Sequence, residues 1–75
     1  LMATNTFTVT GMTCGHCVSS VAEEVGKITG VQDVKVDLVA GGESRVTVTS
    51  ADDVPVDEVR AAVDEAGYEL TGTPA

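Results

Sequence analysis

The chain has 75 residues, of which 43% are apolar and 21% are charged, and this composition predicts one small globular domain. Twelve acidic residues against four basic ones give a net charge of −8, which argues against binding to nucleic acid or to an anionic membrane surface. No apolar run approaches the roughly 18 residues of a membrane-spanning helix, and no charged-then-apolar leader is visible. We therefore expect a cytoplasmic protein that does not insert into a membrane.

The first part of the chain predicts a strand followed by a helix. Phe7 and Val9 alternate with threonines, which is the period-two pattern of a strand with one buried face, and Gly11 ends this pattern. From Cys17 onward the apolar residues fall at helical spacing, and Gly30 is the natural end of that helix. The apolar positions of this helix are Val18, Val21, Ala22, Val25 and Ile28.

The next segment predicts a β-hairpin, because two stretches of alternating apolar residues flank the Gly-containing loop at 40–43. The alternating residues are Val34, Val36 and Leu38 before the loop and Val46 and Val48 after it.

A second helix and a short strand follow the hairpin. Pro55 begins the helical pattern and Gly67 ends it. Residues 68–70 are long enough for a short final strand. The expected domain covers 6–71, between a flexible N-terminus at 1–5 and a flexible tail at 72–75.

The predicted order of elements is β-α-β-β-α-β, which indicates an α+β fold. In the split β-α-β sandwich, this order forms a four-stranded antiparallel sheet with both helices packed on one face.

Cys14 and Cys17 stand where the strand pattern ends and the helix pattern begins. The thiolate is the metal ligand, and an ordinary cysteine is mostly protonated at neutral pH, so a metal site needs a lowered thiol pKa. A helix N-terminus supplies unpaired N–H groups and about half a positive charge, which favour the thiolate. We therefore predict a soft-metal site with Cys14 just before the helix and Cys17 in its first turn.

Monovalent copper, Cu(I), suits two sulfur ligands better than zinc does. Soft thiolates select Cu(I), whereas Zn(II) prefers four ligands, which two cysteines cannot supply alone. Two thiolates around a monovalent ion leave one net negative charge, which a helix N-terminus stabilises. Thr13 and Gly15 offer no carboxylate to a divalent ion.

The stretch Gly11-Met12-Thr13-Cys14-Gly15-His16-Cys17, with Gly67-Tyr68 after the second helix, resembles the heavy-metal-associated domains of the CopZ-like bacterial copper chaperones. The resemblance covers about 6–71 and implies a ferredoxin-like fold. It also implies a carrier rather than an enzyme, which binds one Cu(I) between Cys14 and Cys17. The implied partner is the metal-binding domain of a copper-transporting P-type ATPase, which receives copper by thiolate ligand exchange.

Four neighbours of the two cysteines are expected to surround the metal without binding it directly. The resemblance implies that Met12 packs into the core. It favours a Tyr68 that closes over the loop of the two cysteines, although Tyr68 could instead be only a partly buried strand residue. Relatives that handle zinc or cadmium tend to carry an acidic residue just before the first cysteine. This chain has Thr13 at that position, and the absence of an acidic residue favours copper. His16 is expected to face solvent. Alternatively, its imidazole could bind a second copper in a copper-bridged dimer. Without metal, the chain is expected to be a monomer.

Other assignments stay open at this point. An excised N-terminal metal-binding domain of the ATPase would share the chemistry, and a chain that begins near Met2 and trails off at 71–75 favours the free chaperone. A thiol-disulfide oxidoreductase also uses Cys-x-x-Cys at a helix N-terminus, but its fold needs a longer chain. Mercury-binding relatives share the motif, and a copper-responsive regulator is a second conceivable partner.

Overall fold

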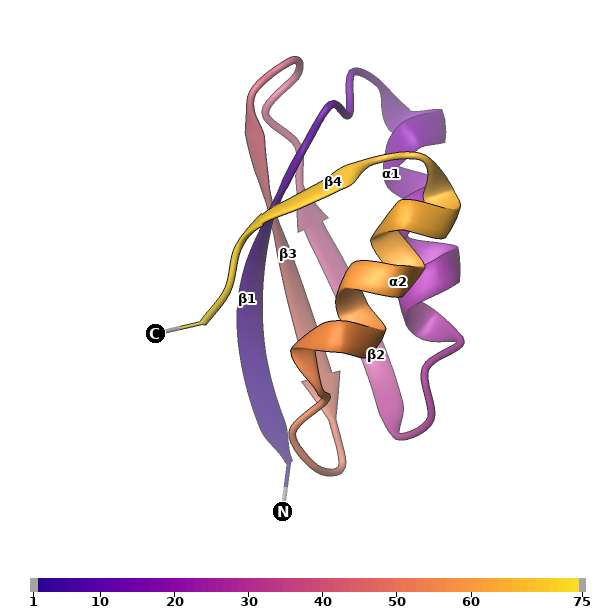
Figure 1. Ribbon diagram of the computed structural model, residues 1–75, viewed down its shortest axis with the longest axis vertical. Helices are drawn as coiled ribbons and strands as arrows, with labels where there is room; N and C mark the ends of the chain where they lie inside the picture. The colour runs from indigo at the N-terminus through magenta and orange to yellow at the C-terminus, as the bar shows by residue number, and fades with distance from the viewer. Residues whose placement is uncertain (1, 75) are drawn as a thin grey trace.

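The predicted order of strands and helices is present in the computed structural model, which describes residues 2–74 (Figure 1). The elements are β1 Ala3–Thr10, α1 Gly15–Gly26, β2 Val31–Asp37, β3 Glu43–Ser50, α2 Val56–Ala66 and β4 Glu69–Gly72.

The four strands form one antiparallel sheet in the order β2-β3-β1-β4. Both helices cover the same face of this sheet, and α1 contacts β2 while α2 contacts β4 (Figure 1). The prediction of an α+β, ferredoxin-like β-α-β-β-α-β sandwich is therefore confirmed. Neither helix among residues 2–74 has the length and apolar character needed to cross a lipid bilayer.

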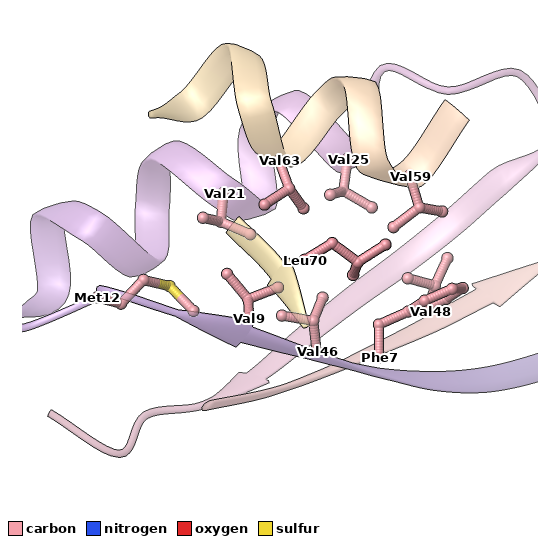
Figure 2. Close-up of a cluster of buried hydrophobic side chains, with 10 residues drawn as sticks. All are labelled: Phe7, Val9, Met12, Val21, Val25, Val46, Val48, Val59, Val63 and Leu70. Atoms are coloured by element: carbon pink, nitrogen blue, oxygen red, sulfur yellow. The ribbon is translucent and has the colours of Figure 1, made fainter. Parts of the chain in front are cut away.

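The core lies between the sheet and the two helices and consists mainly of valine (Figure 2). Alternate residues of β1 and β3 point toward the helices, and each helix contributes two valines spaced four residues apart. Complete burial of such a side chain stabilises the fold by roughly 1.5–3 kcal/mol relative to exposure. The buried apolar residues are Phe7, Val9, Met12, Val21, Val25, Val46, Val48, Val59, Val63 and Leu70.

Strand β1 begins earlier than the sequence predicts. We expected a flexible segment at 1–5, but Ala3 pairs with Ser50 and Asn5 pairs with Val48 of β3. The pairing of β-strands uses backbone groups, so a segment without apolar alternation can extend a strand when its neighbour is long enough. At the other end β4 includes Thr71 and Gly72, the latter expected in the tail, whereas Leu1 and Ala75 lie outside the described residues.

Helix α1 ends at Gly26, and the predicted end at Gly30 is wrong. Glycine has low helix propensity, and the N–H of Lys27 already bonds to the carbonyl of Glu24, in the tighter pattern of a last turn. Ile28 follows the helix but still packs against the core.

Leu38 lies outside β2, although its position continued the predicted alternation. The last pair of the β2–β3 ladder joins Asp37 to Arg45. Beyond the end of β2, the N–H of Val39 bonds to the side chain of Ser44 and not to the backbone of β3. Leu38 is consequently 39% exposed.

Candidate metal centre

The loop between β1 and α1 brings the two cysteines to the N-terminus of α1, as predicted. Residues 11–17, which comprise this loop and the first residues of α1, are named the metal loop after their predicted role. Cys14 is the N-cap residue with extended backbone angles, and its carbonyl accepts the N–H of Val18 at 3.2 Å. Gly15 begins the helix, which puts Cys17 in the first turn. Residues three apart lie on one side of a helix end, so both sulfurs point into the same space.

The two sulfurs are close enough to share one ion. The Sγ atoms of Cys14 and Cys17 are 3.7 Å apart, and both side chains are free thiols. Cys14 is exposed, whereas Cys17 is half-buried and packs against the core. With metal–sulfur bonds of about 2.3 Å, one ion can contact both atoms without a large movement of the backbone.

The environment of Cys17 favours the thiolate and lowers its pKa from 9.0 to about 6. The largest cause is a hydrogen bond from the backbone N–H of Thr13, followed by one from the Tyr68 hydroxyl. The Thr13 hydroxyl, 3.7 Å from the Cys17 Sγ, and the N–H of Cys14 add to the effect, while partial burial opposes it. At neutral pH Cys17 is therefore mostly a thiolate, the form that binds metal.

Tyr68 reaches the metal loop from the opposite end of the chain. It follows the last turn of α2, where its N–H bonds to the carbonyl of Val63 at 3.1 Å. Its ring packs beside Gly11, where an added Cβ would lie 3.4 Å from the Tyr68 Cδ1. The hydrogen bond to the Cys17 thiolate raises the pKa of Tyr68 above its usual value, and burial adds to this.

Met12 and His16 lie on opposite sides of the loop. Met12 is fully buried in the core, so the expectation that it packs there is confirmed (Figure 2). His16 is exposed in the first turn of α1, and its imidazole has no hydrogen bond or ion pair within residues 2–74. It lies in a surface depression between α1 and α2, whose lining includes Ser19, Glu23 and Glu65.

The two sulfurs are the potential metal donors that lie close together at this loop. Across the described part of the chain, no three His, Cys, Asp or Glu side chains gather in a way that could hold a metal ion. The arrangement suits an ion of low coordination number, and it could also close to a disulfide.

The sequence did not reveal one contact of the metal loop. The N–H of Gly41, in the turn between β2 and β3, donates to the carbonyl of Met12 at 2.9 Å. The glycine pair at 41–42 signals a turn but does not say which segment that turn contacts.

The fold and the exposed thiol pair define a ferredoxin-like domain with a Cys-x-x-Cys loop at the start of its first helix. Residues 6–69 match the family model of the heavy-metal-associated domain, and the chain belongs to this family.

Two copper chaperones and one solved metallochaperone structure resemble the chain over most of its length. It is 41% identical over 63 residues to the copper chaperone CopZ of Enterococcus hirae, a match covering 84% of this chain and 88% of that protein. It is 40% identical over 70 residues to CopZ of Bacillus subtilis, a match that covers 92% of this chain and 97% of that protein. A solved CopZ metallochaperone superposes with a TM-score of 0.79 at 33% identity, covering 92% of this chain and all of that chain.

Copper pumps contain similar segments. The chain is 38% identical over 64 residues to copper-transporting ATPase 1 of Rhizobium meliloti, a match that covers 85% of this chain but 7% of the ATPase.

Proposed function

We propose that this protein is a copper chaperone that binds one Cu(I) between the sulfurs of Cys14 and Cys17 and hands it to a second protein. The observation that carries the proposal is the pair of free thiols 3.7 Å apart at the N-terminus of α1, where the pKa of Cys17 falls to about 6. Similarity to CopZ over most of both chains supports copper as the cargo.

The donor set supports the monovalent ion over a divalent one. Two thiolates are soft ligands that favour Cu(I), whereas Zn(II) would need two further donors. Within residues 2–74 no third His, Cys, Asp or Glu joins the two cysteines. The first turn of α1 also contains no acidic residue, so the thiolates are the anions placed beside the positive end of this helix.

Exposure of Cys14 supports transfer by ligand exchange. A thiolate of the partner forms a bond to copper while one bond from this chain breaks, and then the second bond exchanges in the same way. No electron is transferred, so copper remains Cu(I). Because a bond to the partner forms before the last bond to this chain breaks, copper is not released to water.

The surface around the loop supports the approach of a partner protein. Segments 11–17, 38–42 and 67–68 contain no Asp, Glu, Lys or Arg, although the chain carries a net charge of −8. Removing such an uncharged surface from water costs less than removing a charged one. We propose the metal-binding domain of a copper-transporting P-type ATPase as the recipient, because a segment of copper-transporting ATPase 1 is 38% identical to this chain over 64 residues.

The proposal makes the protein a carrier rather than an enzyme. We place it in the cytoplasm, since reducing conditions there keep both thiols free to bind metal.

An anaerobic titration with Cu(I) against a coloured high-affinity Cu(I) chelator tests the metal site. We expect the wild type to retain one Cu(I) in competition, and Cys14→Ser and Cys17→Ser each to lose affinity by about a hundredfold or more, because a hydroxyl is a poor ligand for a soft ion. His16→Ala is the matched control in the same loop and should bind as the wild type does. Zn(II) should bind weakly to all four proteins.

Two results would overturn the copper assignment. One is a double variant, Cys14→Ser with Cys17→Ser, that retains Cu(I) as strongly as the wild type. The other is a wild type that yields copper readily to the chelator while its thiols cycle with a protein disulfide, which would indicate an oxidoreductase.

Direct transfer is tested by mixing the Cu(I)-loaded protein with the isolated metal-binding domain of a copper ATPase in the presence of the chelator. Ligand exchange predicts that copper reaches the domain without colouring the chelator. Colour that develops before the domain is loaded would contradict it.

A second candidate is that this chain is itself a metal-binding segment of a copper ATPase, which the 38% identity to copper-transporting ATPase 1 supports. The metal chemistry would be unchanged. The genomic reading frame distinguishes the two, since continuation into membrane-spanning segments would favour the ATPase.

A further inference from the structure

The turn between β2 and β3 is bonded to the metal loop. The N–H of Gly41 donates to the carbonyl of Met12 at 2.9 Å, two residues before Cys14. The Met12 side chain is fully buried, so this residue is held both by its side chain in the core and by its carbonyl at the turn. Figure 1 shows the β2–β3 turn and the metal loop at the same end of the molecule.

The geometry of the turn makes the Gly41 N–H available. The N–H of Gly42 closes the turn by donating to the carbonyl of Val39 at 2.9 Å. Gly41 is the third residue of this turn and has a φ of +75°, the left-handed conformation that a type II turn requires at that position. Its own N–H is not used to close the turn, so it can bond to Met12.

Ser44 holds the first residue of the turn from inside the protein. Its side chain is completely buried on the inner face of β3. The Ser44 Oγ accepts a hydrogen bond from the N–H of Val39 at 2.9 Å, and its hydroxyl donates to the carbonyl of Val39 at 3.3 Å. A hydroxyl in an otherwise valine-rich layer is costly to bury unless it is bonded in this way.

We infer that Ser44 is a positioning residue for the metal site. It fixes Val39 and with it the turn, the turn presents the Gly41 N–H to Met12, and Met12 sets the path of the backbone into Cys14. This inference rests on the proposed function, since the geometry that it explains is that of the copper ligands. A loop held in its binding conformation loses less freedom when the ion binds, so affinity is higher than for a mobile loop.

A pair of buried serines on one strand makes a matched test. Ser44 and Ser50 are both on the inner face of β3 and at most 1% exposed. The Ser50 hydroxyl donates to the carbonyl of Asp52 at the opposite end of β3, where Ser50 pairs with Ala3, away from the metal loop. Ser44→Ala and Ser50→Ala therefore remove the same group from similar surroundings, and only the first lies next to the metal loop.

The experiment measures Cu(I) affinity by chelator competition for the wild type and both variants, together with amide hydrogen exchange of the reduced protein without metal. We expect Ser44→Ala to weaken Cu(I) binding by about threefold to tenfold, the equivalent of roughly one hydrogen bond. The Gly41 amide should exchange about tenfold faster in this variant, because its bond to Met12 opens more often. Ser50→Ala should change neither quantity by more than about twofold.

Equal Cu(I) affinities for Ser44→Ala and Ser50→Ala would overturn the inference, whatever the two changes do to stability. If Ser44→Ala does not fold, Gly41→Ala replaces it, since its added Cβ contacts nothing within 4 Å and disturbs only the left-handed backbone of the turn. Wild-type affinity in Gly41→Ala would then be the overturning result. A wild type that binds no Cu(I) contradicts the proposed function itself, so the two failures are distinguishable.

Discussion

The two cysteines of the metal loop are chemically unequal, although they belong to one short motif. Cys17 is half-buried and surrounded by donors from Thr13, Tyr68 and Cys14, which lower its pKa to about 6. Cys14 is exposed at the N-cap. In the proposed transfer, Cys17 is therefore the sulfur that the protein stabilises, and Cys14 is the one that a partner thiolate reaches first.

Tyr68→Phe tests the contribution of the phenol to this inequality. The variant retains the ring that packs beside Gly11 but loses the hydroxyl that bonds to the Cys17 thiolate. We expect the pKa of Cys17 to rise above about 6, toward the value of an ordinary thiol. Ultraviolet absorbance of the thiolate, followed during a pH titration of Cys14→Ser and of Cys14→Ser with Tyr68→Phe, measures this shift. Overlapping titration curves would show that the phenol contributes nothing.

At the scale of elements, the ends of the two helices differ in a way that their sequences only partly indicate. Helix α2 ends at Gly67, as predicted, with a φ of +94°. Helix α1 ends at Gly26, whose neighbour Lys27 retains right-handed helical angles. Both ends contain a glycine, but only the end of α2 depends on the left-handed conformation.

This difference predicts opposite effects for the same substitution. Gly67→Ala should lower the free energy of unfolding by about 1 kcal/mol, because a Cβ strains the left-handed backbone. Gly26→Ala should raise it by about 0.5 kcal/mol, because alanine favours the helix and no atom lies within 4 Å of the added Cβ. Denaturant unfolding of the two variants gives both values. Destabilisation of similar size in both would refute the assignment of these two helix ends.

At the scale of the whole molecule, the low pKa of Cys17 links the protonation of this thiol to folding. In the unfolded chain this thiol titrates near 9.0, and in the folded protein near 6, so between these values the unfolded state binds more protons. The contribution of the Cys17 thiolate to the free energy of unfolding is therefore present in full above pH 9, and it is lost as the pH falls through 6.

The free energy of unfolding of the reduced, metal-free protein should consequently rise with pH between 6 and 9 more steeply than that of Cys17→Ser. The other ionisable groups are common to both proteins, so the difference between the two slopes reports on Cys17. Denaturant unfolding at several pH values in this interval measures both slopes. Parallel curves would mean that the folded state does not favour the Cys17 thiolate.

Much of the fold and of the site could be read from local patterns. The order of elements, the inward-facing valines and the placement of Cys14 and Cys17 at the start of α1 all depend on periods of two to four residues. Such periods are properties of the chain itself, because a strand or helix must turn one side toward the core. The heavy-metal-associated family model matches residues 6–69, which include all of these stretches.

The tertiary structure alone decided which distant groups act on the metal loop. The hydrogen bond from Tyr68 to Cys17 depends on where α2 ends, and the contact of Gly41 with Met12 depends on how the β2–β3 turn is held by Ser44. The pairing of Ala3 with Ser50 likewise depends on the length of β3. Each of these contacts joins residues far apart in the chain through backbone or hydroxyl groups, which leave no periodic signal in the sequence.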